Sequence, residues 1–161
     1  MINKIAIDKT IELIRDDWFL ITAMKKDGQV NTMTAQWGTI GYLWGREIAT
    51  IYIRPTRFTH EFIMESESFS ISFFDKSYKE KLKYLGTVSG RDEDKIYNAN
   101  LSIMTKKEAP YFKEASMTIV CKKIYLSKID KNGFLDREID KKVYGDNDYH
   151  TVIVGEIQEI F

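Results

Sequence analysis

The residues with the clearest chemical potential in this sequence are suited to binding an anion. Residues 54–59 (Arg-Pro-Thr-Arg-Phe-Thr) combine two guanidinium groups with two hydroxyls where a β-branched segment gives way to a helical pattern. Helix N-termini offer unpaired N–H groups, and a planar guanidinium can meet two phosphate oxygens at once. The segment therefore predicts a phosphate site, with candidate ligands Arg54, Thr56, Arg57 and Thr59. Alternatively, these residues cap the helix and pair with Glu61 or Glu65.

A second polar stretch covers residues 31–38 (Asn-Thr-Met-Thr-Ala-Gln-Trp-Gly), where small hydroxyl and amide side chains alternate with apolar ones. A strand of this kind, with free backbone N–H groups at its end, can donate hydrogen bonds to a planar heterocycle. The alternative is an ordinary strand with one solvated face, because Thr is favoured in strands.

A third stretch, residues 86–95, contains small hydrogen-bond donors followed by mixed charges. Ser89, Gly90 and Lys95 could complete an anion site. The acidic side chains at 92–94 would weaken such a site unless they point away or cap a helix, so a solvated turn is the alternative.

Other kinds of site have little support in the sequence. The two histidines and the single cysteine are too few for a zinc cluster and lie at no metal-ligand spacing, so we expect no metal. No Gly-x-Ser-x-Gly motif and no close Cys and His pair indicates nucleophilic catalysis. Cys121 lies in an apolar segment and is expected in the core. Since it cannot form an intramolecular disulfide, a reducing compartment is expected.

Composition narrows the class of protein. The chain has 161 residues, 24 basic and 24 acidic, with a formal net charge of zero and 43% hydrophobic residues. We therefore expect a folded chain, one domain over residues 1–161, and no nucleic-acid or anionic-membrane partner. No continuous apolar run resembles a signal peptide or a membrane span, which favours a cytoplasmic protein.

The surrounding pattern predicts mainly strands. Strands are expected over 18–24 and 30–37, joined by a hairpin at Asp27-Gly28, and over 47–53 and 68–73. Longer strands are expected over 117–129 and 150–160, interrupted at Lys122-Lys123 and at Gly155 respectively. Such interruptions are typical of bulges or bends that curl a sheet into a barrel. Without a strand–helix rhythm, a small antiparallel barrel is favoured over a doubly wound sheet.

Three short helices are predicted around these strands. The first carries Ile7, Ile11 and Ile14 after a capping Asp8, and the second opens near Thr56 or Thr59. The third follows the capping-box spacing of residues 77–80 and ends at Gly86. Residues 86–110 are expected to be connecting structure, with room for a short helix after Arg91.

Taken together and in this order, four segments resemble the flavin reductase-like, FMN-binding split-barrel family, in particular its flavoredoxin-type members. They are residues 31–38, residues 54–59 ahead of Glu61-Phe62-Ile63, residues 89–95, and His150 before residues 154–157. The resemblance runs from about Trp18 to Phe161. It implies a mainly β fold, a six-stranded antiparallel split β-barrel with short flanking helices. It also implies a homodimer with one FMN per subunit near the dimer interface.

The resemblance also assigns roles to residues of this chain. It implies that residues 32–36 line the isoalloxazine, mostly through the main chain, and that residues 54–59 hold the ribityl phosphate. His150 would lie near the flavin or the facing subunit, where a hydride donor or acceptor approaches. Trp37 could border the ring, or could equally be a core or interface residue. The implied FMN-binding residues are Thr32, Met33, Thr34, Ala35, Gln36, Trp37, Arg54, Thr56, Arg57, Thr59, Ser89, Gly90 and Lys95.

Three functions are consistent with this resemblance. The first is an NAD(P)H-dependent flavin oxidoreductase, with NADH or NADPH as a transient hydride donor and His150 as the catalytic residue. The second is a non-enzymatic FMN electron carrier that serves a protein redox partner. The third is a barrel that has lost flavin and binds another ligand or chain. A flavin carries the redox chemistry itself, which accounts for the lack of a nucleophilic motif.

Overall fold

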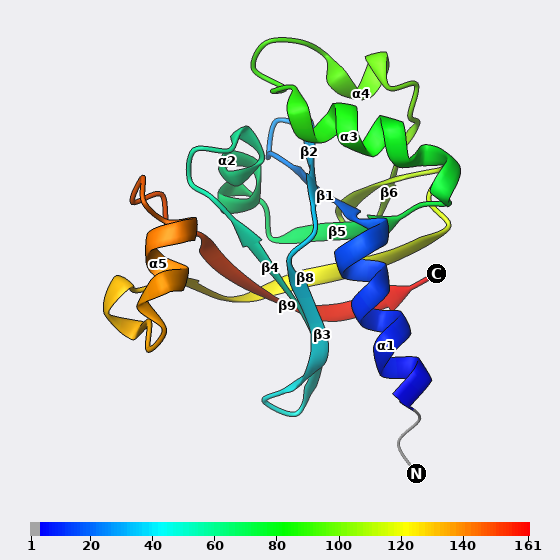
Figure 1. The fold of residues 1–161 in the computed structure, drawn as a ribbon. Helices are drawn as coiled ribbons and strands as arrows, with labels where there is room; N and C mark the ends of the chain where they lie inside the picture. Colours follow the sequence, from blue (N-terminus) through cyan, green and yellow to red (C-terminus); the bar gives the residue numbers. More distant parts are fainter. Residues whose placement is uncertain (1–3) are drawn as a thin grey trace.

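A curled antiparallel sheet forms the centre of the computed structural model, which describes residues 4–161, with side chains from residue 8 onward (Figure 1). The large sheet has the strand order β2-β1-β5-β8-β9-β4-β3, and a separate hairpin pairs β6 with β7. The strands are β1 (Phe19–Met24), β2 (Val30–Ala35), β3 (Gly38–Leu43), β4 (Arg46–Ile53), β5 (Ser68–Phe73), β6 (Ile103–Lys106), β7 (Ala109–Phe112), β8 (Met117–Lys128) and β9 (Thr151–Ile160).

Short helices surround this sheet. In Figure 1, α3 and α4 lie together at the top of the view, α5 lies at the left, and α1 runs along the right. The α-helices are α1 (Lys4–Glu12), α2 (Phe58–Glu65), α3 (Lys79–Thr87), α4 (Lys95–Asn98) and α5 (Arg137–Val143). A π-helical turn and two 3-10 turns add Leu13–Asp17, Lys76–Tyr78 and Lys131–Gly133. None of the helices in residues 4–161 is long and apolar enough to cross a bilayer.

One core joins strands from distant positions in the sheet, which shows that the sheet curls. Fully buried side chains of β1 and β4, which do not pair with each other, belong to the same cluster, and α2 contributes to it as well. The fold is therefore mainly β and barrel-like, as expected. The buried cluster contains Phe19, Ile21, Ala23, Ala49, Ile51, Ile53, Phe62, Ile63, Phe69, Ile71, Phe73, Ile119, Cys121 and Ile153.

The irregularities predicted in the last two long strands are confirmed. The β8–β9 register shifts between Val120 and Cys121 and again between Lys123 and Tyr125. At Gly155, which faces Lys123, a Cβ atom would lie 2.7 Å from the Cys121 Cβ. Only glycine permits this close approach, and the bulges give the sheet its bend.

Two helices, α1 and α3, differ from their predicted boundaries. The first helix begins at Lys4, so Asp8 lies inside it and cannot be its N-cap. Ser77 caps nothing with its side chain; instead its backbone N–H donates to Asp75 Oδ1 at 3.0 Å. The capping-box prediction is therefore wrong, because the aspartate two residues earlier accepts the free N–H group. Helix α3 ends at Thr87, one residue beyond the predicted stop.

Four elements were missed by the sequence pattern: β3, β6, β7 and α5. Strand β3 pairs with β4 although most of its residues are exposed, so it lacks the one-sided burial that marks a strand. The β6–β7 hairpin occupies part of the segment expected to be connecting structure. Helix α5 is only seven residues long and is capped by Asp136. With β3, the large sheet has seven strands where the resemblance implied six.

Candidate functional site

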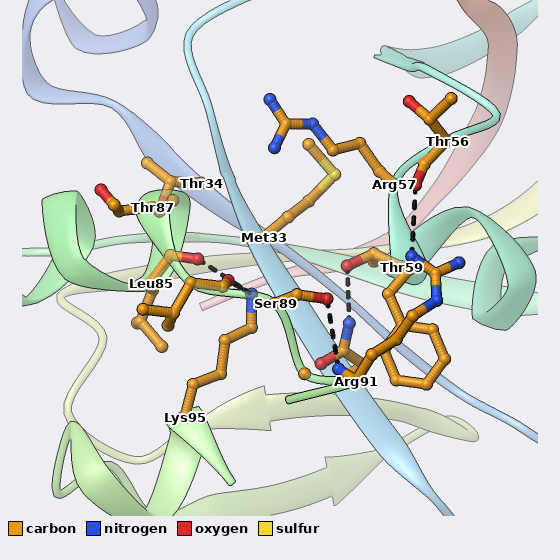
Figure 2. A pocket seen from close by; sticks show the side chains of 15 residues that line it. Met33, Thr34, Thr56, Arg57, Thr59, Leu85, Thr87, Ser89, Arg91 and Lys95 are labelled. Carbon is orange, nitrogen blue, oxygen red and sulfur yellow. Dashed lines mark hydrogen bonds between the residues drawn. The ribbon is translucent and has the colours of Figure 1, made fainter. Parts of the chain in front are cut away.

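A cavity of about 170 Å³ lies where β2, the start of α2 and the loop after α3 meet (Figure 2). The hairpin turn after β1 and the helix after β4 place these elements together, although they are distant in the sequence. The cavity brings together most of the predicted phosphate residues. The predicted phosphate residues that line it are Thr56, Arg57, Thr59, Ser89, Gly90 and Lys95. Met33 and Thr34, which were predicted to line the flavin ring, also border it.

Of the three basic residues that line the cavity, Arg57 is the least engaged by the described part of the protein. It occupies the N-cap position of α2 with an extended backbone, and its side chain is exposed. Within the described side chains, its guanidinium makes no hydrogen bond or ion pair. The N–H groups of Phe58 and Thr59, in the first turn of α2, have no intrahelical acceptors. Charge and unsatisfied donors therefore face the same space, which favours an anion there.

Thr59 and Gly90 shape the wall of this cavity. Asn31 Nδ2 donates to Thr59 Oγ1 at 2.9 Å, so the Thr59 hydroxyl proton is left to donate elsewhere. At Gly90, a Cβ atom would lie 2.3 Å from Asn31 Oδ1. The loop can therefore close against β2 only because residue 90 has no side chain.

Lys95 forms the buried end of the cavity. Its Nζ donates to the Leu85 carbonyl at 2.9 Å and to the Val88 carbonyl at 3.1 Å. The side chain is 4% exposed. Burial, followed by the charge of Arg57, lowers the pKa of Lys95 to about 8. Lys95 thus holds the end of α3 in place and keeps a cation beside the cavity.

Arg91 also lines the cavity, but sequence reasoning did not select it as a site residue. Its guanidinium donates to Glu61 at 2.5 Å and lies 4.7 Å from the Phe58 ring centroid. The hydrogen bond from Arg91 lowers the pKa of Glu61. The alternative in which Glu61 pairs with Arg54 or Arg57 is therefore wrong. A lone arginine in a polar loop carries no periodic signal that could have revealed this partner.

A cleft of about 220 Å³ adjoins the cavity and shares Met33, Thr34 and Arg57 with it. It extends along the end of β2, where the sequence predicted the site for a flat ring. Its remaining lining residues are Ala35, Gln36, Trp37, Tyr52, Arg54 and His150. Cavity and cleft together form a continuous recess with Arg57 at the junction.

Arg54 and Thr56 are bound by acidic residues that follow α5. Arg54 donates to Asp146 Oδ2 and to the Val143 carbonyl, each at 2.7 Å. The Thr56 hydroxyl donates to Asp148 Oδ2 at 2.6 Å. Arg54 borders only the cleft, not the cavity. Of the four predicted phosphate ligands in residues 54–59, Arg57 and Thr59 are thus the ones with free donors at the cavity.

His150 lies on the cleft with one ring nitrogen committed. Its Nδ1 is 2.8 Å from the Tyr144 hydroxyl, and its ring centroid is 5.1 Å from that of Trp37. Burial, followed by the charge of Arg54, lowers the pKa of His150 to about 4. The imidazole is therefore neutral at neutral pH, and Nε2 is the nitrogen left for the cleft.

Two predicted ring-binding residues use their hydroxyls elsewhere. Thr32 is fully buried and donates to the Ile21 carbonyl at 3.0 Å, and it lines neither recess. Its side chain is therefore not part of the site. Thr34 Oγ1 donates to the Leu82 carbonyl at 2.5 Å and so ties β2 to α3. No cluster of potential metal ligands occurs among the described side chains.

Comparison with known proteins gives a consistent picture. The family model for the flavin reductase like domain matches residues 16–161. Flavoredoxin of Desulfovibrio vulgaris (Miyazaki F) is 25% identical, with a TM-score of 0.70 over 89% of this chain and 68% of its own. The FMN-binding protein from Thermus thermophilus, solved with p-hydroxybenzaldehyde, is 21% identical, with a TM-score of 0.67 over 89% of this chain and 70% of its own.

A third solved structure, nitrilotriacetate monooxygenase component B from Bacillus cereus, is 16% identical with a TM-score of 0.69, covering 99% of this chain and 79% of its own. Among the curated proteins compared with it, none matches the chain. The family match spans nearly all of the curled sheet and both recesses. The chain belongs to the flavin reductase-like family.

Proposed function

We propose that this protein binds FMN, with the phosphate in the cavity at the start of α2 and the isoalloxazine in the adjoining cleft. The observation that carries the proposal is the shared position of Arg57, whose unpaired guanidinium lies where an anionic site meets a flat slot. Thr59 and the first-turn N–H groups of α2 add neutral donors. The residues present thus fit a ligand that joins a phosphate to a planar ring.

The chain's own residues would bind and orient this ligand. Met33 and Trp37 border the cleft and offer apolar surface to a ring. Tyr144 holds His150 by its Nδ1, which leaves Nε2 to exchange a hydrogen bond or a proton with a reactant in the cleft. Bound FMN would supply two-electron redox chemistry, for which the chain needs no nucleophile.

We further propose that the protein is an NAD(P)H-dependent flavin oxidoreductase. The cleft that would hold the flavin ring also contains His150, whose imidazole is neutral and keeps Nε2 for a reactant. An electron carrier serving a redox protein is the second candidate, favoured by the similarity to flavoredoxin.

One experiment separates these functions. Purified protein is saturated with FMN, its spectrum is recorded, and NADH and then NADPH are added without oxygen. Bleaching of the flavin bands by either nucleotide, followed by turnover with free flavin, supports the oxidoreductase. Bound flavin that resists both nucleotides but accepts electrons from a reduced redox protein supports the carrier. Failure to bind FMN refutes both.

We also propose that the protein is a homodimer that works in the cytoplasm. The β3–β4 hairpin projects from the sheet (Figure 1) and exposes large apolar side chains, with Tyr42 74% and Trp44 59% exposed. Trp44 also contacts Tyr125 of β8, so the apolar surface continues onto the sheet. Sedimentation should show a dimer for the native chain and a monomer for Trp44→Glu. An unchanged mass would place the interface elsewhere.

A further inference from the structure

A third space, separate from the cavity and the cleft, continues from the cleft on the side of α5. It has a volume of about 500 Å³ and shares Gln36, Trp37 and Tyr52 with the cleft. Its outer wall contains Phe134, Ile139 and Val143, from the segment between β8 and β9. We call this recess the apolar chamber, defined by these six residues together with Ile14, Gly38, Ile129 and Tyr144.

The chemistry of the chamber differs from that of the cleft beside it. None of its lining residues carries a charge, and Gln36 supplies the only side-chain amide. Aromatic rings of Trp37, Tyr52 and Phe134 offer faces and edges on which a flat ring can pack. Its volume lies within the range of about 300 to 1,000 Å³ typical of small-molecule sites. An ionised ligand would lose hydration there without gaining a partner.

Arg54 lies against the chamber wall at Tyr144, but its charge is already paired with a carboxylate. Arg54 is committed to Asp146 and to the Val143 carbonyl, and its guanidinium lies 5.6 Å from the Tyr144 ring centroid. Arg54 and Arg57 line the cleft but not the chamber. The phosphates of a nicotinamide nucleotide would therefore be placed in the cleft, and the chamber is left for a group without charge.

The wall of the chamber is fixed before any ligand arrives. Asp136 accepts the N–H of Glu138 at 3.0 Å and so caps α5. On the same helix, Asp140 accepts the hydroxyl of Tyr149 at 2.6 Å. With the bond from Arg54 to the other end of α5, these contacts hold the helix against the body of the protein. A preformed concave wall favours a small molecule over a flat protein surface.

We propose that the apolar chamber binds an uncharged, flat aromatic or quinone-like molecule and holds it beside the cleft. The position of this molecule next to a flavin rests on the proposed function, whereas its binding does not. Trp37 and Tyr52 separate the two spaces and contact both. A reactant in the chamber would thus lie beside the ring-binding cleft and near His150, on the opposite side from the phosphate cavity.

The test uses 2-naphthol as an uncharged flat probe and 2-naphthalenesulfonate as its anionic counterpart. Titration calorimetry of the whole chain should show saturable binding of 2-naphthol and at least about tenfold weaker binding of the sulfonate. No binding of 2-naphthol, or equal affinity for the two probes, overturns the proposal. FMN binding is measured separately, so loss of FMN binding with intact 2-naphthol binding refutes the proposed function alone.

A pair of variants on one segment locates the site. Ile139 lines the chamber and is 47% exposed, so Ile139→Glu adds a carboxylate there without entering the main core. Leu135 is fully exposed and lines neither the chamber, the cleft nor the cavity, which makes Leu135→Glu the matched control. We expect at least about tenfold weaker 2-naphthol binding for Ile139→Glu, none of this loss for Leu135→Glu, and unchanged FMN affinity for both.

Two results would overturn this location. Equal binding of 2-naphthol by Ile139→Glu and the native chain would place the probe elsewhere. A dimer that dissociates on Ile139→Glu, with no 2-naphthol binding by the native chain, would show that a second copy covers the chamber. Circular dichroism of both variants confirms that each is folded.

Discussion

Replacing Arg57 by alanine tests the anionic half of the proposed site. Its guanidinium makes no hydrogen bond or ion pair among the described side chains, so its removal should leave the stability of the fold almost unchanged. The same removal should weaken FMN binding, because the residue lies where cavity and cleft meet. The variant therefore separates a ligand-binding role from a structural one.

The expected loss follows from the environment of the side chain. A hydrogen bond to a charged group contributes about 1.5 to 3 kcal/mol, and an exposed donor such as Arg57 falls toward the lower end. About 1.5 kcal/mol corresponds to roughly a tenfold weaker FMN affinity. Arg57→Lys keeps the charge but loses the planar fork, so it should recover part of this loss.

Quenching of flavin fluorescence measures this affinity, with riboflavin as the comparison ligand. Riboflavin lacks the phosphate, so Arg57→Ala should change its affinity far less than that of FMN. Urea unfolding without flavin should give equal stability for the variant and the native chain. An unchanged FMN affinity, or an equal loss for FMN and riboflavin, would refute the assignment of Arg57 to the phosphate.

Other residues of the site give further measurable outcomes. Gly90→Ala should lower the free energy of unfolding by about 1 to 3 kcal/mol and weaken FMN binding, whereas Gly41→Ala, with open space around it, should do neither. A bound phosphate should raise the lowered pKa of Lys95, so FMN binding at pH 8.5 should be accompanied by proton uptake. Calorimetry in two buffers measures this uptake, and Lys95→Met should abolish it. Below about pH 6.5 His150 is protonated in the unfolded chain, whereas in the folded chain its pKa is about 4. The free energy of unfolding should therefore fall by about 3 kcal/mol as the pH is lowered from about 6.5 to about 4. Urea unfolding of His150→Gln should show a flatter dependence on pH. Tyr144→Phe should convert a single His150 tautomer into a mixture of two, because the hydrogen bond to Nδ1 is lost. The NMR chemical shifts of the ring nitrogens report the tautomer. Unchanged shifts would show that Tyr144 does not fix the His150 tautomer.

Much of the fold is predictable because strand periodicity depends on one-sided burial. Residues 68–73 alternate between Phe or Ile and Ser, and they form β5 as predicted. Gly155 interrupts an apolar strand, and it marks a real bend because the Cys121 side chain leaves no room for a Cβ atom. Strand β3 escaped prediction, since its side chains face solvent and carry no burial pattern.

The residues around the site were predictable, but their partners were not. Arg57, Thr59, Gly90 and Lys95 meet at one cavity, as their types indicated. The pairing of Arg54 with the loop after α5 joins positions 92 residues apart, and no local pattern encodes it. Thr32 belongs to the same polar stretch as the residues that line the cleft, yet its hydroxyl donates to the Ile21 carbonyl.

The electrostatics of the recess favour an anion independently of any resemblance. Burial lowers the pKa of Lys95, and the charge of Arg57 lowers it further, so two cationic side chains oppose each other at the cavity. Asp146 and Asp148 lie near Arg54, and Glu61 is bound by Arg91. Glu93 raises the pKa of Lys95 by less than Arg57 lowers it. A phosphate next to Arg57 would relieve the repulsion and gain the free donors of α2. The charge of Arg57 is therefore left for an anion that no acidic side chain among the described residues supplies.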